Sequence, residues 1–248
     1  MPAFDDSNLR SGFNRYFRID TALDGALLDE AFRLRHAVYC EDLRFEPQRP
    51  DGREYDEFDA HSIHCLLRSI TPPNESVGCT RIVFANPENP ELPLPFERSC
   101  ADVLDRRIID PAKLPRDRIA EISRLAVAKR YRSRKGERQA QLSIGPDDFS
   151  GTSQPRFPYI PVGLYMGAIS LAIRNDIDTL FVLTEPRLAS HFARLGVDIR
   201  QIGGPIEHRG TRVPSVVDVP SVVRNMRMIM RPLWHTIDEE IARSLKQR

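Results

Sequence analysis

A stretch from Ile119 to Gly136 places ionisable side chains at spacings that could support chemistry. Its first half alternates apolar and polar residues, as a β-strand does, and carries Glu121 and Arg124 among apolar neighbours. Residues three apart in a regular strand point to opposite faces, so these two side chains share a face only if a β-bulge shifts the pleat between them. The pattern therefore predicts a bulged strand with two charged groups on one side.

A basic turn follows this strand directly. Within ten residues the chain places the basic side chains of Lys129, Arg130, Arg132, Arg134, Lys135 and Arg138, together with Gly136. Mutual repulsion within such a cluster favours a negatively charged partner. The sequence therefore predicts a strand that leads into an anion-binding turn, and the alternative is a solvated surface turn.

The composition is that of an ordinary globular protein. The chain has 248 residues, 41% apolar and 29% charged, with a net charge of +1, so it can bury one substantial core and carries no global charge signal. No apolar run approaches the roughly 20 residues that a membrane-spanning helix needs, and the N-terminus is unlike a secretory signal. We therefore expect a cytoplasmic protein without integral membrane association.

Neither a metal site nor a disulfide is expected. His61 and His64 lie near Asp56 and Asp59, but their spacing matches no standard metal site. The cysteines lack paired spacing and are expected to be free thiols: Cys40, Cys65, Cys79 and Cys100.

Three segments are predicted: a loose N-terminal arm (1–13), a mixed domain (14–219) and a helical C-terminal extension (220–248). The domain opens with a short strand from Arg15 to Ile19. Apolar residues spaced by three or four then predict an amphipathic helix from Leu27 to Leu43.

An acidic loop, residues 45–59, follows this helix, and its Pro-Asp-Gly punctuation indicates a course over the surface. Strand-like runs at 63–70 and 77–84 then predict an antiparallel hairpin. The second run places Arg81 among apolar residues, where an unpaired charge is costly. We therefore expect an acid from the preceding loop, or a polar ligand, beside Arg81.

The second half of the chain begins with irregular segments. Residues 85–118 form a long excursion with a short helix at 100–104, and residues 139–161 form a second long loop, of a kind that is usually functional or disordered. A helix from Val162 to about Asn175 carries small residues on one side, which permits close packing. A buried strand, 179–183, follows.

Two helices are predicted in the C-terminal extension. Ser221 caps the first, which carries three methionines and ends at Pro232, and Thr236 with Glu239 forms a capping box for the second. Such a tail is most often a packing surface or a homodimer contact, and its soft methionine face also suits an acyl chain.

Four short motifs follow one another along the chain. They are an Arg-x-x-x-aromatic helix end with a later aromatic residue (Arg35, Tyr39, Phe45), a Glu-x-Asp-x-aromatic-Asp segment (Glu54, Asp56, Phe58, Asp59), a Gly-x-x-Arg strand with a later phenylalanine (Gly78, Arg81, Phe96), and a Glu-x-Ser-Arg-x-Ala-Val strand (Glu121, Ser123, Arg124, Ala126, Val127). Together they resemble the acyl-homoserine-lactone synthases and the N-acyl amino acid synthases of the GNAT acyltransferase superfamily. The resemblance spans roughly Phe17 to Val219.

Two features depart from the lactone synthases. Phe45 replaces their usual tryptophan, and the chain is longer. In both respects the chain resembles more closely the acyltransferases associated with the PEP-CTERM/exosortase system.

The resemblance implies an α/β GNAT fold for residues 14–219, with a mixed, twisted sheet that splays at its centre and holds the pantetheine of an acyl donor. The donor would be acyl carrier protein or acyl-CoA, with no tightly bound cofactor, and acyl carrier protein would be a partner. The donor phosphate would face the basic turn, which could equally dock an acidic carrier protein. The implied donor-binding residues are Val127, Lys129, Arg130, Arg132, Arg134, Lys135 and Gly136.

The implied reaction moves a long acyl group to the amine of a small acceptor, such as an amino acid, by direct attack in a ternary complex. Glu54 or Glu121 would take the amine proton, Arg124 would act beside them, and backbone N–H groups between Arg124 and Val127 would hold the thioester oxygen. The implied acceptor pocket comprises Arg35, Tyr39, Phe45, Asp56, Asp59, Arg81, Phe96 and Ser123. Alternatively, the arginines and acids are buried ion pairs that only hold the loop to the sheet.

Two other functions remain open. One is lactone synthesis from S-adenosylmethionine, and the other is a non-catalytic module that binds an acyl carrier or acyl-CoA. Nucleic-acid binding is not expected, because the basic charge is local and no recognition motif accompanies it.

Overall fold

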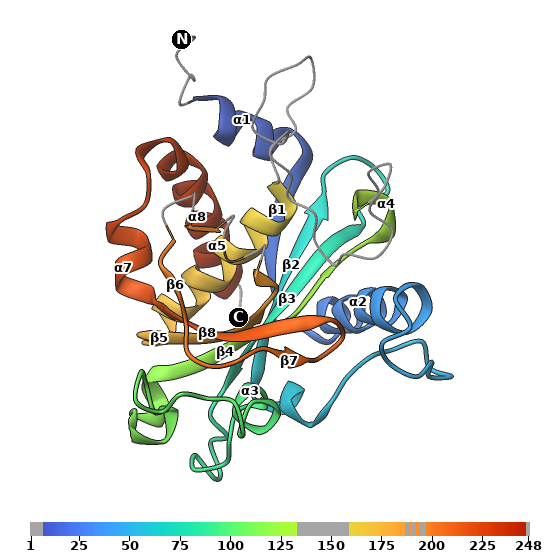
Figure 1. Cartoon of the computed structure of the whole chain (residues 1–248). Coiled ribbons are helices and arrows are strands. Elements are labelled where there is room, and N and C mark those ends of the chain that lie inside the picture. The colour runs from blue at the N-terminus through green and yellow to red at the C-terminus, as the bar shows by residue number, and fades with distance from the viewer. Residues whose placement is uncertain (1–6, 133–158, 187–188, 190–191, 194–196, 247–248) are drawn as a thin grey trace.

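The computed structural model describes residues 7–132, 159–186, 189, 192–193 and 197–246 (Figure 1). The described helices are α1 (Ser7–Tyr16), α2 (Gly25–His36), α3 (Pro95–Ser99), α4 (Lys129–Arg132), α5 (Tyr159–Arg174), α7 (Val219–Arg224) and α8 (Arg231–Lys246). The described strands are β1 (Phe17–Ala22), β2 (Ser62–Ser69), β3 (Ser76–Phe84), β4 (Ile119–Val127), β5 (Thr179–Thr184), β6 (Ile199–Gln201), β7 (Ile206–Glu207) and β8 (Thr211–Asp218). Short helical turns lie at Ala37–Asp42, Glu57–His61, Pro111–Lys113, Arg116–Arg118 and Met228–Met230.

A mixed sheet runs through the molecule in the strand order β1-β2-β3-β4-β5-β8-β6, and β7 pairs with β8. Among the described strands, β4 and β5 pair in parallel and the other neighbours pair antiparallel. The predicted hairpin is confirmed as β2 and β3. The predicted mixed sheet between helices is likewise confirmed.

The strands β4 and β5 part halfway along their length. Backbone pairing joins residues 119–122 of β4 to residues 179–182 of β5. Beyond these residues β4 follows β3 to Val127, whereas β5 follows β8 to Thr184. The sheet is therefore splayed between two adjacent strands, and the opening can admit a ligand.

A β-bulge in β4 lies where the splay begins. Cys79 and Arg81, two residues apart on β3, pair with Ala126 and Ser123, which are three residues apart on β4. Arg124, within that step, has a positive φ of 52°, which a residue with a side chain adopts only at a cost. A bulge was predicted between Glu121 and Arg124. The bulge is confirmed, but it lies between Ser123 and Ala126 and includes Arg124.

Helices cover both faces of the sheet. The helices α5 and α8 pack on each other and on one face, and α2 packs on the opposite face (Figure 1). The backbone N–H groups of Ile19 and Thr21 in β1 donate to Glu240 Oε2 and Ser244 Oγ of α8, each at 2.9 Å. The C-terminal extension is therefore part of the main core.

The N-terminal segment is more ordered than its sequence predicted. Residues 7–13, expected in a loose arm, belong to α1, and the adjoining strand begins at Phe17 instead of Arg15. Phe13 is fully buried, with its ring centroid 6.4 Å from that of Tyr159 on α5. This aromatic contact anchors α1. The short helix expected at 100–104 lies at Pro95–Ser99 instead.

The C-terminal helices also begin and end differently. Asp218, and not Ser221, caps α7, because its Oδ1 accepts a hydrogen bond from the Ser221 N–H at 2.8 Å. Pro232 lies in the first turn of α8, where no helical hydrogen bond requires its missing N–H. Thr236 and Glu239 are inside α8, and the Thr236 hydroxyl donates to the Pro232 carbonyl at 3.1 Å.

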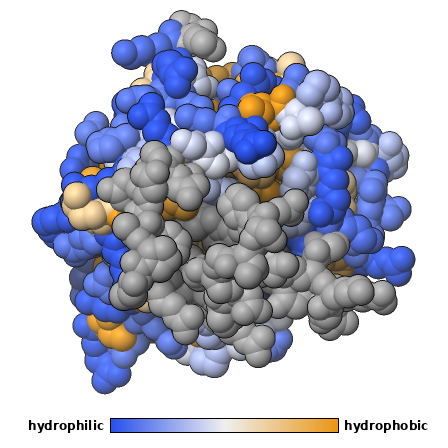
Figure 2. All heavy atoms as spheres, turned by 90° about the horizontal axis from the view of Figure 1, so that it is seen from above, coloured by the Kyte–Doolittle hydropathy of each residue, from blue (hydrophilic) through white to orange (hydrophobic). Residues whose placement is uncertain are grey.

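Polar residues dominate the described part of the face seen from above. Figure 2 shows mostly hydrophilic residues there, with small apolar areas among them. Broad apolar patches are the usual sign of a surface that another molecule covers. Among the described helices, none has both the length and the apolar composition needed to cross a membrane.

Gly167 provides a test of the close contact between α5 and the sheet. A Cβ at this position would lie 2.6 Å from both Cys65 Sγ and Ile19 Cδ1, whereas a Cβ at Gly25 would meet nothing within 4 Å. We expect Gly167→Ala to lower the free energy of unfolding by about 1–2 kcal/mol despite the better helix propensity of alanine. Gly25→Ala should be neutral or slightly stabilising. Urea unfolding of both variants checks this, and equal stabilities would contradict the packing.

Candidate active site

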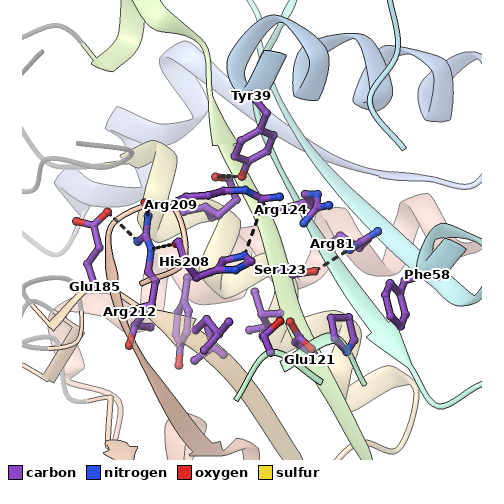
Figure 3. Close-up of a pocket in the computed structure, with 18 of the residues that line it drawn as sticks. Tyr39, Phe58, Arg81, Glu121, Ser123, Arg124, Glu185, His208, Arg209 and Arg212 are labelled. Atoms are coloured by element: carbon purple, nitrogen blue, oxygen red, sulfur yellow. Dashed lines mark hydrogen bonds and ion pairs between the residues drawn. The ribbon is translucent and has the colours of Figure 1, made fainter. Parts of the chain in front are cut away.

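A cavity of about 300 Å³ occupies the splay between β4 and β5. Its wall includes β4 residues 121–125, β5 residues 182–184, and side chains from α5 and from the β7–β8 hairpin (Figure 3). Six residues predicted for the site line it: Tyr39, Asp56, Arg81, Glu121, Ser123 and Arg124. The splay thus gathers residues that are far apart in the sequence.

A buried network of arginines and carboxylates lies beside this cavity. Arg35 on α2 donates to Glu54 Oε2 at 2.5 Å and to both oxygens of Asp59 at 2.7 and 3.1 Å. Arg81 on β3 donates to both oxygens of Asp56, at 2.6 and 3.1 Å, and to Asp59 at 2.7 Å. The expectation that an acid from the preceding loop accompanies Arg81 is confirmed.

Arg124 closes the network from β4. Its guanidinium donates to Glu54 Oε1 at 3.1 Å and to Asp56 Oδ2 at 2.8 Å. Removing one partner from a buried pair leaves an uncompensated charge, at a cost of about 3–5 kcal/mol. The network therefore fixes the acidic loop against α2, β3 and β4.

The titration of Asp59 reflects these contacts. Burial alone would raise the pKa of its carboxyl, but hydrogen bonds from His64 and Arg35 hold the pKa well below its usual range. Asp59 is therefore a permanent carboxylate and does not exchange protons near neutral pH. Its role in the network is to hold charge.

Glu121 has the opposite character. Its side chain is 3% exposed, and Oε2 accepts a hydrogen bond from the backbone N–H of Phe96 at 2.7 Å. Among the described residues, none donates a hydrogen bond to Oε1. Burial raises the pKa of Glu121 to about 8, against smaller lowering effects of the Phe96 N–H, Arg81 and Arg124. Glu121 is thus a carboxyl on the cavity wall that can exchange a proton near neutral pH.

Glu54, the second candidate base, is placed differently. Both of its oxygens are engaged, one by Arg35 and the other by Arg124, and it does not line the cavity. A base needs a free lone pair within reach of the proton that it abstracts. This geometry favours Glu121 over Glu54 for proton transfer.

Other contacts of predicted residues hold the cavity wall or belong to the surrounding core. The Tyr39 hydroxyl donates to the Leu125 carbonyl at 2.7 Å, on the bulge. Phe45 packs in the small core beneath α2. The ring of Phe96 stacks on Phe181, with centroids 4.3 Å apart, and Phe96 does not line the cavity. Val127 is buried in the main core.

The described part of the basic turn is paired with acids. In α4, Lys129 lies 2.9 Å from Asp42, Arg132 also pairs with Asp42, and Arg130 pairs with Glu75. The remaining predicted donor-binding residues, Arg134, Lys135 and Gly136, lie outside the described residues. The repulsion expected within the turn is therefore partly offset by the protein's own carboxylates.

The sequence missed the far wall of the cavity. These additional lining residues include Arg98, Tyr165, Glu185, Phe192, His208, Arg209 and Arg212. They come from α3, α5, the β7–β8 hairpin and the segment that follows β5, and no local pattern connects them. Within the described part of the chain, no cluster of three or more His, Cys, Asp or Glu side chains could hold a metal ion.

Comparisons with known proteins agree with this geometry. Residues 34–140 match the family model described as an acetyltransferase (GNAT) domain. A search of curated protein sequences found no match.

Three solved structures show the likeness of fold. The acyl-homoserine-lactone (AHL) synthase LasI superposes with a TM-score of 0.56 at 20% identity, over 86% of this chain and 96% of that one. The CoA-dependent acyl-homoserine lactone synthase BjaI, solved with SAM and isopentyl-CoA, gives 0.56 at 19%, over 91% and 89%. FeeM, an N-acyl amino acid synthase from uncultured soil microbes, gives 0.54 at 14%, over 87% and 97%.

The chain therefore has the GNAT fold, and its residues 34–140 match an acetyltransferase (GNAT) domain. The predicted fold and the predicted acyltransferase class are confirmed. Its structural likeness is to acyl-homoserine-lactone synthases and an N-acyl amino acid synthase. The closer likeness to acyltransferases of the PEP-CTERM/exosortase system stays a prediction.

The raised pKa of Glu121 predicts a pH-dependent loss of stability. Between the ordinary pKa of 4.5 and the folded value of about 8, the unfolded chain releases a proton that the folded chain retains, so stability falls as pH rises and levels off above pH 8. Glu121→Gln cannot ionise. We therefore expect the difference in free energy of unfolding, Glu121→Gln minus wild type, to increase by roughly 3–5 kcal/mol as pH rises over this interval.

Urea unfolding of both proteins at about pH 5 and pH 9 measures the difference. Glutamine retains the oxygen that accepts from the Phe96 N–H, so the fold is preserved in the variant. Parallel pH dependence in the two proteins would contradict a raised pKa at Glu121.

Proposed function

We propose that this protein is an N-acyltransferase that moves a long acyl group from acyl carrier protein or acyl-CoA to the amine of a small acceptor such as an amino acid. The observation that carries the proposal is the buried carboxyl of Glu121 on the wall of the cavity in the splay. Its pKa of about 8 suits a base that must accept a proton from an ammonium group near neutral pH.

The reaction is a direct attack within a ternary complex. Glu121 takes a proton from the acceptor amine, through a water molecule or directly, and the nitrogen attacks the thioester carbonyl carbon. The C–N bond forms, the C–S bond breaks, and the thiolate leaves and takes up a proton. Backbone N–H groups of β4 between Arg124 and Val127 hold the oxyanion that develops on the way.

The donor's pantetheine lies in the splay in this proposal, with its phosphate toward the basic turn that follows β4. The ion pairs of Lys129 and Arg130 are exposed on the basic side, so solvent screens them and an incoming anion can compete for these groups. The CoA-dependent synthases among the structural neighbours support a thioester donor. Acyl carrier protein is the alternative source of the same pantetheine group.

The acyl chain extends toward a small apolar cavity of about 20 Å³ behind the first one. Tyr165 and Phe192 line both cavities, with ring centroids 4.4 Å apart, and so form the partition between them. Beyond the partition lie Met226, Met230 and Trp234, and methionine side chains adapt readily to a flexible chain. For the C-terminal extension, the sequence predicted a packing surface or a homodimer contact, with a methionine face that also suits an acyl chain. In this proposal the extension both packs on the core and contacts the acyl chain.

Glu121→Gln tests the assignment of the base. We expect kcat to fall by about 10²–10⁴-fold with a small change in KM, because a positioned base contributes to that extent. The wild-type rate should rise with pH through about 8, where Glu121 becomes ionised. Glu91→Gln, at an exposed position, is the matched control. A Glu121→Gln enzyme with normal turnover would remove Glu121 from the mechanism.

Mass spectrometry of small molecules that co-purify from a bacterial host identifies the reaction itself. An N-acylated amine enriched with the wild-type protein, and absent with Glu121→Gln, supports acyl transfer and names both substrates. An acylated lactone would indicate synthesis from S-adenosylmethionine instead. Intact donor bound equally by both proteins would make the chain a binding module without turnover.

The partition residue Tyr165 sets the preferred chain length in this proposal. Tyr165→Ala opens the apolar cavity, so we expect the optimum to shift toward longer chains, whereas Met230→Trp fills the cavity and should shift it toward shorter ones. Relative rates with acyl-CoA donors from octanoyl to stearoyl measure both shifts. An unchanged length profile in both variants would place the acyl chain elsewhere.

A further inference from the structure

The turn of the β7–β8 hairpin holds Arg209 in an unusual backbone conformation. Arg209 has a φ of 58° and Gly210 a φ of 96°, both in the left-handed region, which only glycine adopts without cost. From this turn the Arg209 side chain crosses the cavity toward Tyr39 and Arg124 (Figure 3). Strain of this kind persists where the surrounding structure enforces it, and here it directs a guanidinium into the cavity.

Arg212, on β8, holds the turn in place. Its Nε donates to the His208 carbonyl at 3.4 Å, and its Nη2 donates to the Arg209 carbonyl at 3.3 Å. Its Nη1 donates to Oε1 of Glu185, which directly follows β5, at 2.7 Å. Arg212 is therefore a positioning residue for the Arg209 side chain.

The guanidinium of Arg209 has donors to spare. It pairs with Glu46, and its Nη1 contacts His208 Nε2 at 3.4 Å. Because a guanidinium only donates, Nε2 accepts in this contact and the His208 proton lies on Nδ1. Arginine carries five N–H groups in a planar fork, so these two contacts leave room for a planar anion such as a carboxylate.

The charges that face the cavity are predominantly positive. The arginines that line the cavity are Arg81, Arg98, Arg124, Arg209 and Arg212, and the carboxyl groups that line it are those of Asp56, Glu121 and Glu185. Carboxylates that balance these arginines without lining the cavity include Glu46, Glu54, Glu57 and Asp59. The cations therefore face a ligand more directly than their partners do.

The pKa of His208 is affected by these positive charges. Burial lowers the pKa of its imidazole, and the nearby charges of Arg124 and Arg212 lower it further. A field that expels a proton from histidine attracts an anion to the same place.

We propose that the turn of the β7–β8 hairpin, through the Arg209 guanidinium, binds the carboxylate of the acceptor, so that the enzyme acylates amino acids in preference to plain amines. The inference rests on the proposed acyl transfer and adds the chemical class of the acceptor. Glu121 on β4 and Arg209 in the β7–β8 turn line the same cavity, so the cavity wall offers a partner to both the amine and the carboxylate of an acceptor. Arg209 thereby orients the amine toward the base.

Product binding tests this without any need for turnover. Calorimetric titration compares N-decanoyl-phenylalanine with N-decanoyl-phenethylamine, which lacks only the carboxylate. We expect wild type to bind the carboxylate form about 10–100-fold more tightly, the range of a charge-assisted, bidentate hydrogen bond. Arg209→Gly, which tolerates the left-handed turn, should reduce this preference to about threefold or less and leave the affinity of the neutral amide unchanged.

Two further variants sharpen the outcome. Arg209→Lys should retain part of the preference, because it keeps the charge and loses the planar fork. Glu46→Gln should increase the preference, because it removes the carboxylate that competes for the same guanidinium. Equal affinities for the two ligands in wild type, binding of neither, or equal losses for both in Arg209→Gly would overturn the proposal.

Turnover separates this inference from the proposed function. With decanoyl-CoA as donor, Arg209→Gly should raise KM for phenylalanine and leave KM for decanoyl-CoA unchanged. A raised KM for decanoyl-CoA alone would assign Arg209 to the donor phosphate and overturn the carboxylate site. Acylation of phenylalanine and phenethylamine at equal rates would leave acyl transfer standing and remove the hairpin from acceptor selection.

Discussion

The arrangement of this protein depends on the buried pairing between an acidic loop and three arginines on different elements. Asp56 and Asp59 come from a segment with little regular structure of its own, yet they are held by guanidiniums from α2, β3 and β4. A buried ion pair adds little net stability compared with an apolar core, but breaking one partner is costly. Such a network therefore serves mainly to fix one position of the loop, and with it one wall of the cavity.

The splay of the sheet forms the cavity that this fixed wall borders. The parallel pairing of β4 and β5 ends after a few residues, and the bulge at Arg124 lies just beyond that point, while β4 continues to pair with β3 to Val127. Backbone groups along an opened strand lose their neighbours and become available to a ligand. The positive φ of Arg124 is a local cost at the place where the opening begins, as is common at functional sites.

The sequence predicted one half of the site and missed the other for a physical reason. Glu121 and Arg124 lie in a continuous strand, and Arg81 is conspicuous as a charge among apolar neighbours, so local patterns pointed to them. Arg209 lies in a turn after a two-residue strand, where periodicity carries no information. Its approach to the cavity depends on the pairing of β8 with β5, which is a long-range contact. Pro232 is a similar case: the local sequence predicts that a helix ends there, whereas the structure places this proline in the first turn of α8.

The contrast between Glu54 and Glu121 shows how burial selects the proton-handling group. Both carboxyls are nearly inaccessible to solvent, and both stand in motifs that could supply a base. Arginines engage both oxygens of Glu54, and Glu54 does not line the cavity, so its carboxyl does not face a substrate there. Among the described residues, the one direct hydrogen-bond donor to Glu121 is a backbone N–H, so desolvation dominates and raises the pKa of its carboxyl to about 8. Similar burial thus leaves one carboxyl engaged by arginines and the other able to accept a proton, and the partners decide which.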